Sequence, residues 1–182
     1  IFVAIPYPNI IETAVPIAAP IISNLGTKII VNKSIMRCAL YFGSFNPLHI
    51  GHAAIARYVL ENCNVDTLRL VLTPMNPFKE ADPTLANVEL RLENLRKSVD
   101  KFNRNSGNCS SENRSRKKLE ISTVEFDLPK PNYTYNTLQH LKAIEPDNTF
   151  IIIMGADNLA VIEKWHKGLE ILSTYEVWVY PR

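Results

Sequence analysis

The stretch Gly43-Ser44-Phe45-Asn46-Pro47-Leu48-His49-Ile50-Gly51-His52 decides the fold of this chain. The run before it, Cys38-Ala39-Leu40-Tyr41-Phe42, is short and apolar and predicts a buried strand. The residues after it are apolar at helical spacing: Ile55, Ala56, Val59 and Leu60. The stretch therefore joins a strand to the N-terminus of a helix, where backbone N–H groups and the helix dipole favour anions.

Glycines and histidines in this turn suit a polyphosphate ligand. Gly43 lets the backbone approach a ligand closely, and Pro47 stiffens the turn. His49 and His52 can both reach one ligand as hydrogen-bond donors or as cations. A single loop glycine or histidine is usually structural, so the prediction depends on two histidines flanking Gly51.

Size and composition indicate one globular domain. A chain of 182 residues can bury a substantial core, and 46% apolar and 21% charged residues are ordinary values. A net charge of +2 favours no particular partner, and we predict no nucleic-acid partner. The three cysteines are Cys38, Cys63 and Cys109, and they lack CxxC or metal-ligand spacing. This predicts reduced thiols in the cytoplasm and no metal held by the protein.

Both ends of the sequence are unusual. Residues 1–35 precede Met36 and are apolar, but four prolines interrupt them, which argues against a membrane-spanning helix. We expect this segment to be an extension outside the fold, translated upstream of a true start at Met36. A small accessory strand is the alternative. The other end, Pro181-Arg182, directly follows an apolar strand, an abrupt place for an α/β domain to finish.

Strands and helices alternate from Met36 onward, which predicts an α/β fold with a doubly wound parallel sheet over residues 36–182. The expected strands are Arg37–Phe42, Thr67–Leu72, Glu120–Phe126, Thr149–Met154 and Glu176–Tyr180. The expected helices begin near His52, Thr84, Thr134, Asn158 and Lys167.

Residues 103–118 interrupt this alternation. They are rich in Asn, Ser, Arg and Lys with little to bury, which predicts a mobile surface insertion. Its basic cluster consists of Arg114, Arg116, Lys117 and Lys118 and could touch nucleic acid. No aromatic residues are interleaved for base stacking, so a solvated loop is favoured.

Two further segments follow predicted strands, where loops line the ligand crevice of a doubly wound sheet. Thr73-Pro74-Met75-Asn76-Pro77-Phe78-Lys79 offers Lys79 as a point charge on a phosphate, or simply as an exposed loop lysine. Glu125 and then Pro131–Leu138 join a strand to a helix, with Thr134 as the expected N-cap. The backbone amides at that helix N-terminus could also bind an anion.

The last two segments surround the most hydrophobic strand. Gly155 and Asp157 follow its carboxyl end, where a carboxylate often binds ribose hydroxyls, although Asp157 could merely cap the next helix. Trp165, beside His166, could stack on a flat ring if exposed at the crevice, although packing into the core is the commoner role of tryptophan.

Together these motifs resemble one family, the bacterial nicotinate-nucleotide adenylyltransferases. The opening stretch resembles the HIGH signature of nucleotidyltransferases in the form G-[ST]-F-[DN]-P-x-H-x-G-H, and the later segments resemble P-x-x-P-[HF]-K, E-x(n)-Y-T-x-x-T-L, and G-x-D followed by a Trp. The resemblance spans Met36 to Arg182, apart from the polar insertion. It implies a Rossmann-like fold of the HIGH type, and the later motifs separate this family from phosphopantetheine adenylyltransferase.

The resemblance also implies roles for individual residues. His49 and His52 would hold the ATP phosphates and stabilise the transition state, and Lys79 would orient phosphate. The cleft would be lined by Gly43, Ser44, Phe45 and Asn46, and the adenosine ribose would be contacted by Gly155 and Asp157. The nicotinate carboxylate would be bound by Thr134 and the backbone of His166, and Trp165 would stack on the pyridine ring.

Three positions depart from the family pattern. Phe78 stands where many members have His, and His166 replaces a frequent aromatic residue. The family's C-terminal I-S-S-T-x-[IV]-R segment, which grips the triphosphate, is absent before the sequence ends at Arg182. The resemblance therefore predicts a C-terminally truncated domain.

The implied reaction is transfer of the adenylyl group of ATP to nicotinate mononucleotide, with Mg²⁺ carried on ATP oxygens. Alternatives are another acceptor, nicotinamide mononucleotide or phosphopantetheine, or a truncated nucleotide-binding module without catalysis. The expected partners are ATP and nicotinate mononucleotide, with no nucleic acid and no membrane, and the oligomeric state is left open.

Overall fold

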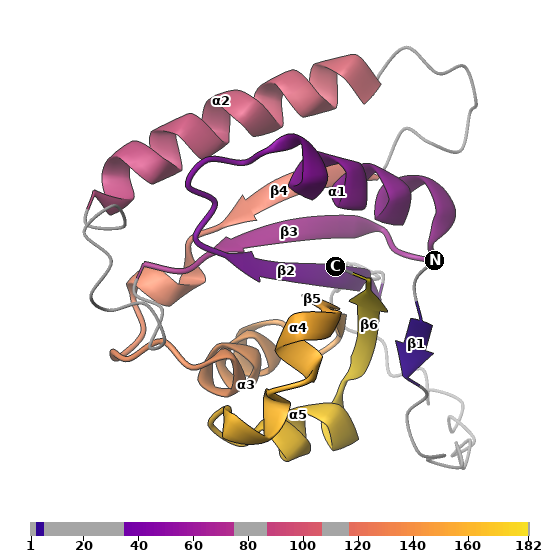
Figure 1. The fold of residues 1–182 in the computed structure, drawn as a ribbon, viewed down its shortest axis with the longest axis vertical. Helices are drawn as coiled ribbons and strands as arrows, with labels where there is room; N and C mark the ends of the chain where they lie inside the picture. Colours follow the sequence, from indigo (N-terminus) through magenta and orange to yellow (C-terminus); the bar gives the residue numbers. More distant parts are fainter. Residues whose placement is uncertain (1–2, 6–34, 75–86, 107–116, 182) are drawn as a thin grey trace, which may run out of the picture.

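The computed structural model describes residues 3–5, 35–74, 87–106 and 117–181, and these form one twisted sheet covered by helices on both faces (Figure 1). The sheet order is β1-β6-β5-β2-β3-β4. The strands are β1 (Val3–Ile5), β2 (Arg37–Gly43), β3 (Thr67–Leu72), β4 (Lys118–Ser122), β5 (Thr149–Gly155) and β6 (Glu176–Tyr180). Strands β2 to β6 pair in parallel, which confirms the predicted α/β class.

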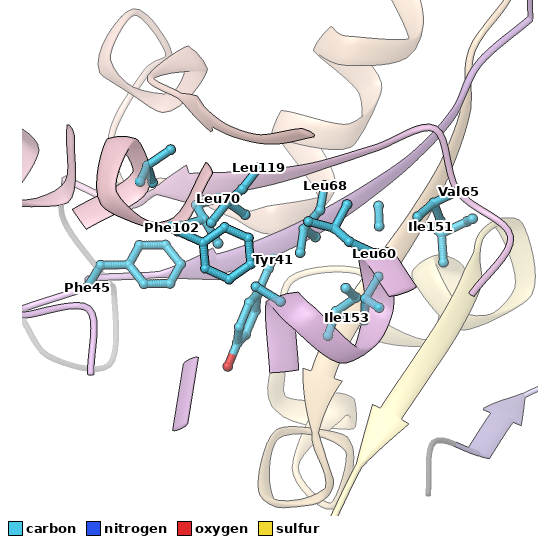
Figure 2. Close-up of a cluster of buried hydrophobic side chains, with 14 of the residues drawn as sticks. Tyr41, Phe45, Leu60, Val65, Leu68, Leu70, Phe102, Leu119, Ile151 and Ile153 are labelled. Carbon is cyan, nitrogen blue, oxygen red and sulfur yellow. The ribbon is translucent and has the colours of Figure 1, made fainter. Parts of the chain in front are cut away.

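The central strands are apolar along their whole length because both faces are covered. Residues Ile151, Ile152 and Ile153 of β5 are all buried, although successive side chains point to opposite faces. One face packs against α1 (Ile50–Asn62) and α2 (Val88–Ser106), and the other against α3 (Thr134–Ile144) and α5 (Gly168–Thr174) (Figure 1). Figure 2 shows part of the cluster under α1 and α2, with Tyr41, Phe45 and Phe102 among its members.

The strand order creates a switch point between β2 and β5. The chain leaves β2 towards α1 on one face, whereas it leaves β5 towards α4 (Ala156–Leu159) and α5 on the other (Figure 1). The two connections therefore diverge and open a crevice at the carboxyl ends of these strands, where ligands of doubly wound sheets bind.

Four of the five predicted strands are confirmed within one residue, and the prediction for Glu120–Phe126 is wrong in its second half. The strand ends at Ser122, and the 3₁₀ turn η2 (Val124–Phe126) follows, closed by the N–H of Phe126 donating to the carbonyl of Thr123 at 2.9 Å. Glu125 lies in this turn, and its side chain is buried in the interior.

The predicted helix starts agree with α1, α3, α4 and α5 within two residues, and Thr84 lies outside the described residues. The N-cap of α3 is Tyr133, not Thr134, and no side chain caps it. Thr134 has already entered the helix, so its side chain is not needed as a cap.

The predicted insertion is shorter than residues 103–118. Residues 103–106 belong to α2, and Lys118 begins β4. The side chain of Asn103 exchanges two hydrogen bonds with the backbone of Leu119, and Lys117 Nζ donates to the carbonyl of Cys63 at 2.9 Å. These polar contacts attach the described ends of the segment, Asn103 and Lys117, to the rest of the fold. Arg114 and Arg116 lie outside the described residues.

Residues 3–5 depart from the expectation that all of residues 1–35 lie outside the fold. Strand β1 pairs with β6 in the antiparallel direction, with Ala4 opposite Trp178. The edge of β6 otherwise presents unpaired N–H and C=O groups, which an extended segment can satisfy. The alternative of a small accessory strand therefore describes these three residues. Among the described helices, none combines the length and apolarity needed to cross a membrane.

Candidate active site

Two adjoining cavities occupy the crevice at the switch point. The histidine cavity, of about 370 Å³, is lined by the turn after β2, the end of β5, and β6; its residues include Ser44, Phe45, Asn46, His49, His52, Asp157 and Tyr180. The aromatic cavity, of about 280 Å³, lies beside it; its residues include Thr73, Glu125, Asn132, Tyr133, Thr134, Lys164, Trp165 and His166. Both cavities share Phe42, Gly43, Asn158 and Trp165. A ligand pair could therefore meet at Gly43.

His49 and His52 cap the N-terminus of α1. The N–H of Gly51 donates to Nδ1 of His49 at 3.1 Å, and the N–H of His49 approaches Nδ1 of His52 at 3.4 Å. Because Nδ1 of each ring accepts, a neutral ring carries its proton on Nε2. The two rings stack with centroids 3.7 Å apart. The motif thus places two stacked imidazole rings at a helix N-terminus, an arrangement suited to anionic oxygens.

Phe45 shapes the turn that carries these histidines. Its backbone has φ 43°, a left-handed conformation that is uncommon for a residue with a side chain. Its ring is only 2% exposed and packs edge-on against Tyr41 and His52, with centroids 5.8 and 5.4 Å away. A Cβ on Gly43 would come within 3.0 Å of this ring. The packing of the Phe45 ring therefore favours glycine at position 43, independently of any ligand.

Arg91 of α2 holds two loops of the site together. Its guanidinium donates to the carbonyls of Ser44, Thr73 and Pro74 at 3.0, 3.1 and 2.9 Å. The residue is 3% exposed, and desolvation lowers the pKa of its side chain. The turn after β2 and the loop after β3 are thus fixed to one side chain. Sequence reasoning missed this residue because its partners are backbone carbonyls, which leave no motif.

The end of β5 brings Asp157 to the histidine cavity, whereas Gly155 is buried beneath it. A Cβ on Gly155 would collide with Oδ1 of Asp157, so the glycine makes room for the carboxylate rather than lining either cavity. On the neighbouring strand Tyr180 shares a 2.9 Å hydrogen bond with Tyr41 through their hydroxyls. This pair lies on the wall of the histidine cavity.

The aromatic cavity combines rings from two segments. The ring of His166 stacks on Tyr133, with centroids 4.7 Å apart, and meets the edge of Tyr135. Trp165 is half-buried against the core under α3 and α5 and lines both cavities. Thr134 lies at the N-terminus of α3 beside them. The structure therefore brings Thr134, Trp165 and His166 together, as their assignment to one substrate requires.

Glu125 is a buried carboxyl in the wall of the aromatic cavity, 1% exposed. Burial raises its pKa to about 7, while the Thr137 and Thr73 hydroxyls act in the opposite direction. Thr137 Oγ1 donates to Oε1 at 2.9 Å, and Asn132 Nδ2 donates to the backbone carbonyl of Glu125 at 2.8 Å. The sequence motif contained Glu125 but gave no sign of this burial.

The structure places every predicted site residue among the described ones except Lys79. All of the others line one of the two cavities apart from Gly155. Sequence reasoning overlooked Asn132, Tyr133, Lys164 and Tyr180, which also line them; for Tyr133 the neighbouring Thr134 was the available signal. The described residues contain no cluster of three His, Cys, Asp or Glu side chains that could hold a metal ion.

Comparison with known proteins agrees with this geometry. The cytidylyltransferase-like family model matches residues 40–182. A Flavobacterium psychrophilum protein named "Probable nicotinate-nucleotide adenylyltransferase" is 41% identical over 148 residues, covering 81% of this chain and 68% of that protein. A Christiangramia forsetii protein of the same name is 39% identical over 146 residues, covering 80% and 68%.

Solved structures share the fold at low sequence identity. The nicotinic acid mononucleotide adenylyltransferase of Plasmodium falciparum, complexed with NaAD, superposes with a TM-score of 0.57 at 17% identity, covering 81% of this chain and 75% of that one. The same enzyme complexed with APC gives 0.55 at 16% identity, with the same coverage. With its HIGH-type turn, its doubly wound sheet and these relatives, the chain belongs to the nicotinate-nucleotide adenylyltransferases of the cytidylyltransferase-like family.

Proposed function

We propose that this protein transfers the adenylyl group of ATP to nicotinate mononucleotide, producing deamido-NAD and pyrophosphate. The observation that carries the proposal is the pair of cavities that share Gly43 and Trp165 at the switch point. One cavity offers donors for phosphate and the other offers aromatic surface for a pyridine ring. Two nucleotides bound in them would meet at the turn after β2. We propose residues 36–182 as the nucleotidyltransferase domain.

In this reaction an oxygen of the mononucleotide phosphate attacks the α-phosphorus of ATP in line. A new P–O bond forms, the bond from the α-phosphorus to the β-phosphate oxygen breaks, and pyrophosphate leaves with that electron pair. Catalysis by positioning and by donors placed where charge develops is sufficient for such a transfer. No covalent protein intermediate is needed.

His49 and His52 supply those donors. Their Nε2–H groups and the first amides of α1 would hold the ATP phosphates and stabilise the charge that develops on the transferred group. Gly43, Ser44, Phe45 and Asn46 would line the cleft through the turn that contains them. Lys79 would add a cation to the phosphates.

The aromatic cavity would receive the pyridine end of the mononucleotide. Trp165 would stack on the ring, while Thr134 and the backbone amide of His166 would bind the nicotinate carboxylate. Asp157 would accept from the adenosine ribose in the histidine cavity, with Gly155 leaving room for its carboxylate.

The metal proposed for this reaction is Mg²⁺, which would neutralise charge on the polyphosphate. The donor set fits a metal that enters with ATP, because Asp157 is the one carboxylate among the described residues lining the histidine cavity, and Mg²⁺ keeps most of its ligands as water and phosphate oxygens. The proposed setting is the cytoplasm, where free thiols such as Cys38 and Cys63 stay reduced. The proposed reaction requires neither nucleic acid nor membrane.

The test is pyrophosphate release from ATP and Mg²⁺ by the purified chain, with nicotinate or nicotinamide mononucleotide or phosphopantetheine as acceptor. Turnover that strongly favours nicotinate mononucleotide supports the proposal. Turnover that favours another acceptor would assign a different substrate to the same site. Binding of nicotinate mononucleotide without turnover would identify a nucleotide-binding module and contradict the proposed catalysis.

A further inference from the structure

Two buried oxygen atoms in the wall of the aromatic cavity make no hydrogen bond of normal distance and angle within the described residues. They are Oε2 of Glu125 and Oδ1 of Asn132. Both residues line the cavity, and Asn132 is only 5% exposed. A buried acceptor without a donor is unfavourable, and in native structures such atoms call for an explanation. A ligand that donates hydrogen bonds would supply the missing partners.

The surrounding hydrogen bonds fix the orientation of both groups. Thr137 occupies Oε1 of Glu125, and the Nδ2 atom of Asn132 is bound to the carbonyl of Glu125. The second of these bonds also settles which end of the Asn132 amide is the oxygen. The bound atoms are thus held by the protein, and the two remaining oxygens form an acceptor pair in the wall of the cavity.

The chemistry of the proposed substrate indicates which of its groups can donate. The nicotinate ring and its carboxylate carry no N–H or O–H when ionised, and the phosphate is mainly an acceptor. The donors of the mononucleotide are therefore its two ribose hydroxyls. A carboxylate is a common partner of ribose hydroxyls in doubly wound folds.

The position of the acceptor pair agrees with a ribose. Thr73 lies between Glu125 and the turn after β2: its hydroxyl acts on the Glu125 carboxyl, and its N–H donates to the carbonyl of Gly43 at 3.0 Å. The turn is assigned to phosphate, and Trp165 with His166 is assigned to the ring. A ribose joins phosphate to ring, so it must lie between these two ends.

We propose that Glu125 and Asn132 bind the ribose hydroxyls of the pyridine mononucleotide. The proposal rests on the proposed function, because the substrate defines the donor. At neutral pH a substantial fraction of the Glu125 carboxyl is ionised, since its pKa is about 7, and a carboxylate accepts stronger hydrogen bonds than a neutral group does. Glu125 is then a substrate-binding residue that the sequence motif did not reveal.

The experiment removes the donor from the ligand and the acceptor from the protein. Calorimetric titration gives the Kd of nicotinate mononucleotide and of its 2′-deoxy and 3′-deoxy forms for the wild-type chain and for Glu125→Met. The Thr137 hydroxyl keeps a second partner, the carbonyl of Tyr133 at 3.3 Å, so this variant does not strand it. We expect at least one deoxy ligand to bind the wild type about 10- to 100-fold more weakly, the usual effect of a hydrogen bond to a charged group.

In Glu125→Met, nicotinate mononucleotide should bind about 10-fold more weakly than it binds the wild type. The deoxy penalty, which is the Kd of a deoxy ligand divided by the Kd of nicotinate mononucleotide, should fall to roughly threefold or less because Asn132 alone remains. Glu125→Gln, which is closer in shape, should give intermediate values and serves if the methionine variant does not fold. The matched control is Thr137→Val, which loses the bond to Oε1 but keeps the acceptor pair and should keep the deoxy penalty.

Equal deoxy penalties in the wild type and in the Glu125 variants would overturn the proposal, and so would the absence of any penalty in the wild type. Because the readout is binding, it stays separate from catalysis. Nicotinate mononucleotide that binds without being adenylylated contradicts only the proposed reaction. A wild-type chain that does not bind nicotinate mononucleotide contradicts both proposals.

Discussion

The histidine cavity and the aromatic cavity adjoin each other but are built in different ways. The key groups of the first come from ten consecutive residues, Gly43 to His52, which run from the end of β2 through the turn into α1. Local hydrogen bonds and ring contacts fix them. The second is assembled from Thr73, from the segment of Glu125 to Thr134, and from the segment of Asn158 to His166. A site encoded locally can be recognised in a sequence, whereas an assembled site requires the fold.

The two cavities also differ in what holds them. In the histidine cavity the donors are fixed by the backbone they cap. In the aromatic cavity a buried carboxyl remains incompletely satisfied. The first arrangement stabilises the free protein, and the second costs stability that a ligand can restore.

The largest expected effect comes from the histidine pair. His49→Ala and His52→Ala should each lower kcat by about 10²–10³-fold, the usual loss when one transition-state donor is removed. His49→Asn separates the two roles of His49, because its amide oxygen can still accept from Gly51 while the Nε2 donor is lost. It should keep the thermal midpoint of the wild type and lose turnover, as measured by pyrophosphate release.

His140 is the matched control for this comparison, since it is an exposed histidine of α3 away from both cavities. His140→Ala should change neither kcat nor stability. Near-normal turnover in both His49→Ala and His52→Ala would contradict the assignment of the histidine cavity to catalysis.

Arg91 tests how far the histidine cavity depends on α2. Arg91→Met should lower the free energy of unfolding by about 2–4 kcal/mol, because one buried and two partly buried carbonyls lose a charged donor. Urea denaturation measures this change. Arg91→Lys should recover part of it through one bond, and kcat/KM should follow the same order. An Arg91→Met protein with wild-type stability would show that α2 does not hold the loops.

Glu125 tests the stability cost of the aromatic cavity. Its pKa in the folded protein, about 7, is raised above 4.5, so the folded state binds a proton more tightly than the unfolded state does. The contribution of Glu125 to stability should therefore fall as pH rises from about 4.5 to 7, and Glu125→Gln should be more stable than the wild type above pH 7 by on the order of 3 kcal/mol. Below pH 4.5 the difference should vanish.

Thermal unfolding at pH 5 and pH 8 measures this effect, with exposed Glu163→Gln as the control. A stability difference between wild type and Glu125→Gln that grows as pH falls would have the wrong sign and would contradict the burial argument.

The smallest expected effect is at Trp165. Trp165→Leu should raise KM for nicotinate mononucleotide about 10-fold, because stacking on an aromatic ring contributes about 1–3 kcal/mol per base, while Trp165→Phe should change it less. Trp178 of β6, which is buried and bound to Glu176, is the control. Trp178→Phe should lower stability without a selective change in KM. The reverse pattern would place Trp165 among the structural residues.

Periodicity and local motifs predicted most of the fold. The apolar runs of β2, β3, β5 and β6 were recognised because strands buried on both faces are continuously apolar. The error at Glu120–Phe126 has the opposite origin: Val124 and Phe126 continue the strand-like pattern, but the chain turns to bury Glu125. A buried carboxyl is rare, and single-sequence patterns assign it to solvent.

Local sequence was enough to identify the stretch from Gly43 to His52, with its two histidines, and the alternation of strands and helices, because these features depend on neighbours within a few residues. Three features became visible only in the tertiary structure. Arg91 binds two loops, Gly155 leaves room for the Asp157 carboxylate, and Glu125 lies in the wall of a cavity with an oxygen that makes no hydrogen bond. The hydrogen bonds of Arg91 join residues 17 to 47 positions apart. Gly155 and Asp157 are only two positions apart, but their close approach, like the burial of Glu125, depends on the backbone conformation and packing that the fold imposes.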